Sequence, residues 1–360
     1  MPHVMTVRGP IDPDDLGFTS MHEHILCDCS IFYKRTEGKF PEDLPVKGTD
    51  QVRLENIGLH QSNISITLDA CLLQDEDMMT QEMLDFKESG GQAMVDMSTP
   101  GLRCDLPGIK RISEAADVHI IATTGLYTED TWPDVFKGRS IEAHVAFMLD
   151  EIENGIEDTG IKPGAIKMAV TTLTEGEELA LRAAGRVSNE TGLMITVHPG
   201  FEIGNDGRRI VKILAEEGAD LERVVIAHGD GFFVGTDLKT LILNPDTWKL
   251  STDYHKELLD QGVNISIDCF GHNWSLEVLG SMIEKDWHRL GGLVALIKDG
   301  YSPQLHLGTD TFIKILTRRG GGHGYSRLTK FVIPAMRDVG VSDFDIRQMT
   351  IENPKRLLAI

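Results

Sequence analysis

The chain has few basic residues, few cysteines and no long apolar run. Its 35 lysines and arginines face 56 aspartates and glutamates, and the formal net charge of −21 argues against nucleic acid and anionic membranes as partners. The five cysteines are odd in number and include no Cys-x-x-Cys pair, which argues against a disulfide framework and a thiolate zinc site. The N-terminal residues lack an apolar signal segment, and no stretch of about 18 apolar residues exists. These absences predict a cytoplasmic protein with a small-molecule partner.

Helical and strand-like segments alternate along most of the chain. An apolar strand at about 18–26 comes first, and the later strands are expected at 93–97, 118–124, 165–169, 193–198, 223–228, 263–268 and 304–310. The helices are expected at 81–89, 108–116, 141–156, 175–188, 207–217, 254–261, 279–300 and from 328 onward. Short, nearly continuous apolar strands are typical of a parallel sheet that is buried on both faces.

Eight strand–helix units predict an α/β protein with a closed (β/α)8 TIM barrel. The competing open, doubly wound sheet would need a Gly-x-Gly-x-x-Gly turn after the first strand, and none is present. We therefore expect a single domain over residues 1–360, with a long insertion at about 30–75 after the first strand. An insertion of this length is usually functional or carries small elements of its own.

Polar residues stand near the C-terminal ends of several expected strands, where barrel enzymes build their active sites. His22 and His24 are one residue apart on a strand, so their side chains point to one face and can share a metal ion. A single histidine in such a place is more often structural than a ligand. The set here is larger, and comprises His22, His24, Lys167, His198, His228 and Asp310. Imidazole and carboxylate donors together suit zinc, manganese, iron or cobalt rather than calcium.

Lys167 is an unusual member of this set, because an ammonium group beside metal ions is repelled and costly to bury. The same surroundings would lower its pKa toward the neutral amine. A neutral amine can take up carbon dioxide to form a carbamate, whose two oxygens could bridge two metals. The alternative is a lysine that only tethers a loop carboxylate.

Short motifs accompany these residues along the chain. They are VRGPI at 7–11, GFT at 17–19, HEH at 22–24, GTD at 308–310 and IENPKR at 351–356. Together with Lys167, His198 and His228, they resemble the phosphotriesterase family of the amidohydrolase superfamily over essentially the whole chain. The resemblance implies a binuclear metal-dependent hydrolase that forms a homodimer.

The resemblance also implies a role for each ligand. One metal would take His22, His24 and Asp310, and the other His198 and His228, with carboxylated Lys167 and a hydroxide bridging the two. The hydroxide would be the nucleophile, and Asp310 would accept its proton and pass it to the leaving group. Zinc is the first expectation for both ions, with manganese, cobalt and iron as alternatives.

Departures from the family's patterns bear on the substrate. Cys269 follows the aspartate of the seventh strand, where organophosphate-hydrolysing members have a histidine and lactonase-type members tend to have an arginine. Tyr127 resembles the lactonase-type tyrosine that contacts the bridging hydroxide or the substrate carbonyl, although it could simply pack the barrel mouth. The segment 320–326 is most similar to the phosphotriesterase-related branch, which includes amide hydrolases and typically has a glutamate in the place of Lys167.

Other residues are weaker candidates for substrate contacts, because each has a structural alternative such as an exposed salt bridge for Arg318. They are His272, Trp274, Arg318, His323 and Tyr325. The first expectation is hydrolysis of a lactone or carboxylic ester, with phosphotriesters as a side activity. The alternatives are hydrolysis of a small N-acyl compound and an inactive metal- or ligand-binding barrel. The complete ligand set argues against the third.

Overall fold

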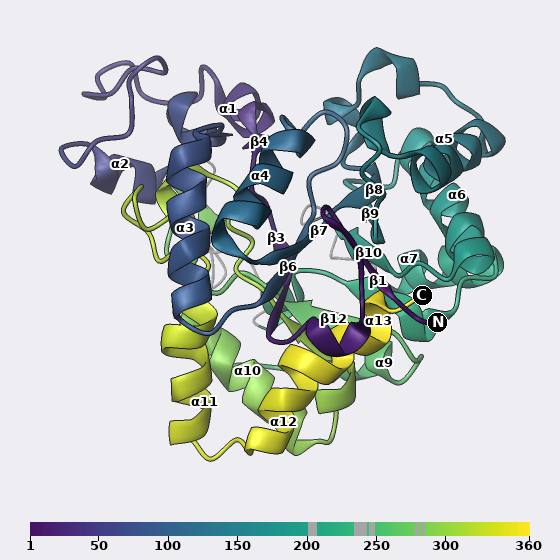
Figure 1. The fold of residues 1–360 in the computed structure, drawn as a ribbon. Helices are drawn as coiled ribbons and strands as arrows, with labels where there is room; N and C mark the ends of the chain where they lie inside the picture. Colours follow the sequence, from purple (N-terminus) through teal and green to yellow (C-terminus); the bar gives the residue numbers. More distant parts are fainter. Residues whose placement is uncertain (201–206, 234–242, 245–248, 278–280, 283–284) are drawn as a thin grey trace.

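Helices surround a barrel of parallel strands in the computed structural model of the chain (Figure 1). The structure describes residues 1–200, 207–233, 243–244, 249–277, 281–282 and 285–360. The barrel strands are β3 (Thr19–Glu23), β6 (Ala93–Asp96), β7 (His119–Ile121), β8 (Thr123–Leu126), β9 (Ala165–Ala169), β10 (Ile195–His198), β11 (Val224–Ile226), β12 (Asn264–Ile267) and β15 (Leu305–Leu307).

These strands form one continuous parallel barrel. Parallel ladders run from β3 through β6 to β7, and from β8 through β9, β10, β11 and β12 to β15. Ala122 alone separates β7 from β8, so these two segments serve as one barrel strand. The barrel closes where the N–H of Asp310, just beyond β15, donates to the carbonyl of His22 in β3 at 3.0 Å. The predicted (β/α)8 fold is confirmed.

The helices follow the strands as expected, with shifted boundaries. They are α3 (Glu76–Glu88), α4 (Leu106–Ala116), α5 (Ile141–Asn154), α6 (Glu175–Thr191), α7 (Gly207–Glu216), α9 (Asp253–Leu259), α10 (Asp286–Lys298), α11 (Ile333–Asp338), α12 (Asp343–Arg347) and α13 (Asn353–Leu358). α3 begins five residues before its predicted start, because the Asp75 carboxylate accepts from the N–H of Met78 and caps it there.

One helix prediction is wrong in extent, and another helical region is interrupted once. The helix expected at 279–300 begins only at Asp286, and part of 279–285 lies outside the described residues. The helical region expected from 328 onward begins there and forms two continuous stretches, 328–338 and 343–358, separated by a turn that contains Gly340 at φ 87°. A positive φ is outside the helical region, so the chain must turn there.

Small elements fill the insertion that follows β3. Residues 30–75 contain α1 (Ser30–Thr36), α2 (Ile57–Ser62) and β5 (Leu72–Leu73), and β5 pairs antiparallel with β4 (Cys27–Asp28). A second short antiparallel pair, β13 (Ser275–Leu276) with β14 (Ser281–Met282), follows β12. An isolated bridge between Asn63 and Leu276 connects the insertion to this pair, so both lie on the side of the barrel where the strands end.

The two chain ends pack at the other side of the barrel. An N-terminal hairpin of β1 (Val4–Thr6) and β2 (Gly9–Ile11) places Val4 in an apolar cluster with Leu357 and Leu358 of α13. The same cluster contains Ala93 and Ala165, which are the first residues of β6 and β9. The termini therefore cover the N-terminal ends of the strands and lie close together in Figure 1. Within the described residues, no helix is long and apolar enough to cross a membrane.

Candidate metal centre

The structure brings all six predicted ligands to the C-terminal end of the barrel. His22 lies in β3 with His24 just beyond it, Lys167 lies in β9, and His198 is the last residue of β10. His228 and Asp310 occupy the loops that directly follow β11 and β15. Lys167 is completely buried, so its ammonium or amine group meets only protein atoms.

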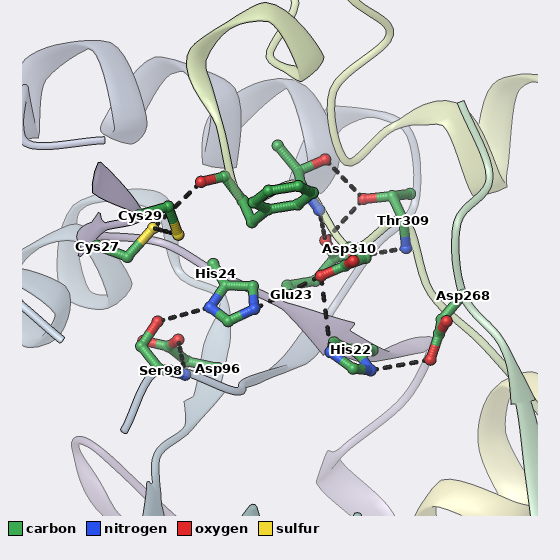
Figure 2. A network of polar contacts seen from close by, with 12 residues as sticks. His22, Glu23, His24, Cys27, Cys29, Asp96, Ser98, Asp268, Thr309 and Asp310 are labelled. Atoms are coloured by element: carbon green, nitrogen blue, oxygen red, sulfur yellow. Dashed lines mark hydrogen bonds and ion pairs between the residues drawn. The ribbon is translucent and has the colours of Figure 1, made fainter. Parts of the chain in front are cut away.

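The first group of donors consists of His22, His24 and Asp310 (Figure 2). One carboxylate oxygen of Asp310 lies 3.6 Å from Nε2 of His22 and 3.5 Å from Nε2 of His24. These distances are long for hydrogen bonds. Two donors that each lie about 2.1 Å from a tetrahedral zinc ion are about 3.4 Å apart. The spacing of the three donors therefore fits a divalent metal ion between them.

The remaining ligands adjoin this group. Nζ of Lys167 lies 3.2 Å from Nε2 of His22. The ring centre of His228 is 4.8 Å from that of His22 and 4.6 Å from that of His198. Burial lowers the pKa of Lys167 to about 8, and the nearby carboxylates of Asp310 and Asp268 oppose this only in part. The six side chains therefore form one cluster, buried except for the partly exposed His198, around a lysine whose pKa is shifted toward the neutral amine.

Electrostatics keep His22, His198 and Asp310 in the forms that bind metal. For His228, burial lowers the pKa, but the carboxylates of Asp268 and Asp310 raise it overall. Burial and the charge of Lys167 lower the pKa of His22 to about 4. Burial and the neighbouring His228 lower the pKa of His198 well below its ordinary value. Burial alone would raise the pKa of Asp310, but His22, His24 and His228 hold it below its usual range. Neutral imidazoles and an ionised carboxylate are the required ligand states.

Glu23, between the two histidines, fixes the loop that carries Asp310. Its carboxylate accepts from the N–H of Thr309 at 2.8 Å, from the Thr309 hydroxyl at 2.6 Å and from the N–H of Thr311 at 3.2 Å. Ser20 also donates to it. Burial raises the pKa of Glu23 to about 8, although the hydrogen bonds from Ser20 and Thr309 act in the opposite direction. The loop needs such support because Asp310 has a φ of 43°, a conformation that costs about 1–2 kcal/mol outside glycine.

Asp268 is the second important carboxylate that the sequence predictions did not include. It follows β12, and its two oxygens accept from Nδ1 of His22 and Nδ1 of His228, each at 2.8 Å. The signal that could have identified it is its position, since it ends its strand as the predicted ligands do. Glu23 carries no such signal, because strand alternation places it on the face opposite to the histidines.

Three predicted substrate contacts lie beside the cluster. The ring of Tyr127 packs edge-on against His198, with centres 5.1 Å apart, and Sγ of Cys269 lies 3.6 Å from Nδ1 of His228. His272 is buried, and its Nε2 lies 3.0 Å from the carbonyl of Asp310. Trp274 donates its indole N–H to Nδ1 of His272 at 3.2 Å, so His272 carries its proton on Nε2 and donates to Asp310.

The other candidates have protein partners. Arg318 forms an ion pair with Asp85 at 2.6 Å, which is the salt bridge given as its structural alternative. His323 lies 3.0 Å from the amide nitrogen of Asn273. Tyr325 is fully buried and donates its hydroxyl to the carbonyl of His24 at 2.5 Å. Contact of these residues with a substrate remains a prediction.

The convergence of imidazole and carboxylate donors at the C-terminal rim of a (β/α)8 barrel is typical of metal-dependent hydrolases, and this protein is one of them. The comparison with known proteins identifies the family within this class. Residues 2–358 match the phosphotriesterase family, and the chain belongs to that family.

The relatives include proteins with named activities. The chain is 28% identical to N-acetyltaurine hydrolase of Salmo salar, over 99% of this chain and 97% of that protein. It is 30% identical to the phosphotriesterase-related protein of Nematostella vectensis, over 98% and 97% of the two chains. Among solved structures, a resiniferatoxin-binding protein from Rhodobacter sphaeroides matches with a TM-score of 0.86 and 26% identity, over 99% of this chain and 94% of that one.

Proposed function

We propose that this protein hydrolyses a small N-acyl compound at its amide carbonyl with the help of two divalent metal ions. The observation that carries the proposal is the convergence of four histidines, one lysine and one aspartate, all but His198 buried, at the end of the barrel where the strands stop. His22, His24 and Asp310 would hold one ion. His198 and His228 would hold the other, with the carbamate of Lys167 between the two.

Bound ions of this kind supply Lewis acidity and a hydroxide nucleophile at neutral pH. Lys167 would contribute by losing its positive charge: its neutral amine and carbon dioxide combine to a carbamate and release one proton. The lowered pKa of about 8 supports this step, because it increases the fraction of neutral amine near neutral pH.

Asp310 would move the proton. Its ionised carboxylate lies 3.5 to 3.6 Å from two imidazole nitrogens, and both its carbonyl and its N–H are fixed by hydrogen bonds. An amide needs a proton on its departing nitrogen, and a carboxylate that has just accepted the proton of the nucleophile can deliver it. Glu23 and His272 would hold Asp310 in place for both transfers.

The relatives favour the amide over the two other functions. N-acetyltaurine hydrolases align with this chain over nearly their full length. A lactone or carboxylic ester is the second candidate, because Tyr127 lies against His198 at the position where lactonase-type members are expected to have a tyrosine.

Matched substrates separate these candidates. We expect the zinc- or manganese-loaded enzyme to hydrolyse a panel of N-acetylated amino acids and aminosulfonates with higher kcat/KM than lactones and esters of the same acyl group. The opposite ranking would select the lactonase or esterase. Two bound metal ions without turnover of any acyl or phosphoryl compound would instead indicate a binding protein.

The metals themselves are a separate measurement. We expect elemental analysis to find two ions per chain, and a wild-type enzyme that binds fewer than two would contradict the binuclear site. A homodimer remains a proposal from the family resemblance, and light scattering at working concentration tests it. A cytoplasmic location remains a proposal from the composition of the chain.

A further inference from the structure

A single buried carboxylate, that of Asp268, contacts two of the histidines of the candidate metal centre. Its Oδ2 lies 2.8 Å from Nδ1 of His22, and its Oδ1 lies 2.8 Å from Nδ1 of His228. The backbone N–H of His228 donates to the same Oδ1 at 3.0 Å. Asp268 has no exposed surface. Figure 2 shows the contact with His22 on the side of the imidazole that faces away from Asp310.

We propose that Asp268 is a positioning residue that sets the tautomer of His22 and His228 together and directs one Nε2 lone pair to each of the two metals. An ionised carboxylate only accepts hydrogen bonds, so each Nδ1 must carry a proton. A neutral imidazole has one N–H, and its other nitrogen is then free to bind metal. For His22 that nitrogen faces the cluster, 3.6 Å from Asp310 and 3.2 Å from Lys167.

The alternative is that Asp268 is itself a metal ligand. A metal ion between Asp268 and either Nδ1 would hold the oxygen and nitrogen about 3.4 Å apart, as for the other donors. The observed separation of 2.8 Å is that of a hydrogen bond with a charged acceptor. The geometry therefore supports positioning over ligation.

Further buried groups hold Asp268 in place. Its backbone N–H donates to Oδ1 of Asp230 at 3.1 Å, and the other oxygen of Asp230 accepts from Nε of the buried Arg289 at 3.0 Å. Gly308 also lies close, and an added Cβ there would come within 2.9 Å of both the Asp268 Cβ and the His22 carbonyl oxygen. The backbone and Cβ of Asp268 are thus held by close neighbours, as expected for a residue that orients two ligands.

His24 provides a natural contrast. Its Nδ1 lies 2.9 Å from the hydroxyl of Ser98, which can either donate or accept and so does not impose a tautomer. Ser98 contacts one ligand of one metal, whereas Asp268 contacts one ligand of each. The inference rests on the proposed function, because it assigns His22 and His228 to different metals.

The variant Asp268→Asn tests the inference, with Ser98→Ala as the matched control. Asparagine keeps the shape but has one acceptor oxygen and one NH2 donor, so it can accept from only one of the two Nδ1–H groups. The other imidazole must then carry its proton on Nε2, and a protonated Nε2 has no lone pair with which to bind metal. We expect Asp268→Asn to lower the affinity for at least one zinc ion 10- to 100-fold, measured by competition with increasing concentrations of a chelator. This is the usual effect of removing the hydrogen-bond partner of a metal-binding histidine. Ser98→Ala should lose less than tenfold.

The two possible failures are distinguishable. A wild-type enzyme that holds fewer than two zinc ions would overturn the proposed function, whereas an Asp268→Asn variant that retains both ions within threefold of wild type would overturn this inference alone. Because the variant could fold poorly, the zinc-loaded wild-type enzyme provides a second measurement. ¹⁵N-histidine NMR should show protonated Nδ1 atoms on both His22 and His228, and metal coordination through either Nδ1 would overturn the assignment.

Discussion

The candidate centre has two flanks that differ in how they are built. On the β3–β15 flank, buried hydrogen bonds from Glu23, Tyr325 and His272 fix the backbone around His24 and Asp310. The β9–β10 flank borders an open pocket of about 90 Å³, lined by Val170, Thr171, Thr172, Leu173, Pro199, Gly200, Arg209 and Ile210. The difference suggests a division of roles, in which one flank holds the reacting groups and the other receives part of the substrate.

The largest expected effect is on the fixed flank. Asp310→Asn removes a metal ligand and the proton carrier, so we expect kcat to fall by at least 10²- to 10⁴-fold, the range for loss of a general base. Steady-state rates on the best amide substrate measure this. Asp134→Asn, a change at an exposed aspartate whose partner is Lys137, should leave kcat unchanged. A kcat for Asp310→Asn within tenfold of wild type would contradict the assigned role.

Lys167 belongs to the other flank, and its Nζ lies 3.2 Å from Nε2 of His22. Lys167→Ala should lower kcat about 10²-fold or more, because the bridging ligand is lost. Short carboxylic acids such as acetate or propionate should restore part of the activity and of the metal content by supplying an oxygen ligand. Wild-type rate and metal content in this variant would refute the carbamate. Lys137→Ala, at a half-exposed lysine, is the control.

Two buried glutamates allow a paired test of the flanks. The two oxygens of Glu23 accept separately from the N–H groups of Thr309 and Thr311, whereas one oxygen of Glu177 accepts from the N–H groups of both Thr171 and Thr174 and the other from that of Glu129. Glutamine replaces one acceptor oxygen by an NH2 group, so each change leaves at least one backbone N–H without its acceptor and should lower the free energy of unfolding by about 1–3 kcal/mol. Urea denaturation measures both.

Only the change at Glu23 should also weaken metal binding, because Glu23 and not Glu177 holds the loop that carries Asp310, a proposed metal ligand. Equal metal content in Glu23→Gln and Glu177→Gln, at equal stability, would show that the fixed flank does not depend on Glu23.

The smallest effect is expected at the rim of the pocket. Arg209 lines the pocket and pairs with Glu178 at 3.2 Å, whereas its neighbour Arg208 pairs with Glu257. If the pocket receives an anionic end of the substrate, Arg209→Ala should raise KM about fivefold with kcat unchanged, which corresponds to about 1 kcal/mol. Arg208→Ala is the matched control and should change neither. An equal effect of the two changes would remove the pocket from the substrate path.

The sequence predicts the barrel well because each strand is an apolar run with a polar residue near its end. It also predicts which six side chains converge at those ends, because histidine, lysine and aspartate there are rare enough to be informative. It does not identify Glu23, because the importance of Glu23 comes from contacts with Thr309 and Thr311 across 286 and 288 positions of sequence. Asp268 ends its strand as the other candidates do, but its role depends on contacts with His228 and His22 across 40 and 246 positions. Such contacts form only when β12 and β15 close on β3.

Helix boundaries also depend in part on contacts that the local sequence does not reveal. The cap at Asp75 can be recognised in the sequence, since an aspartate precedes an acidic first turn there. The late start of α10 at Asp286 cannot, because buried partners fix it: the Asp286 carboxylate accepts from the backbone N–H of Gly271 and pairs with Arg289 and Arg327.

The hydrogen bonds that hold residues 309–311 to β3 also have a consequence for the motion of this loop. The N–H groups of Thr309, Asp310 and Thr311 lie in a loop, yet each donates to a buried acceptor in β3, at 2.8, 3.0 and 3.2 Å. Amide hydrogens held in this way exchange with solvent only when the surrounding structure opens. Native-state hydrogen exchange should therefore find these three amides as slow as those of the barrel strands, so that this side of the active site moves as part of the barrel rather than as a loop.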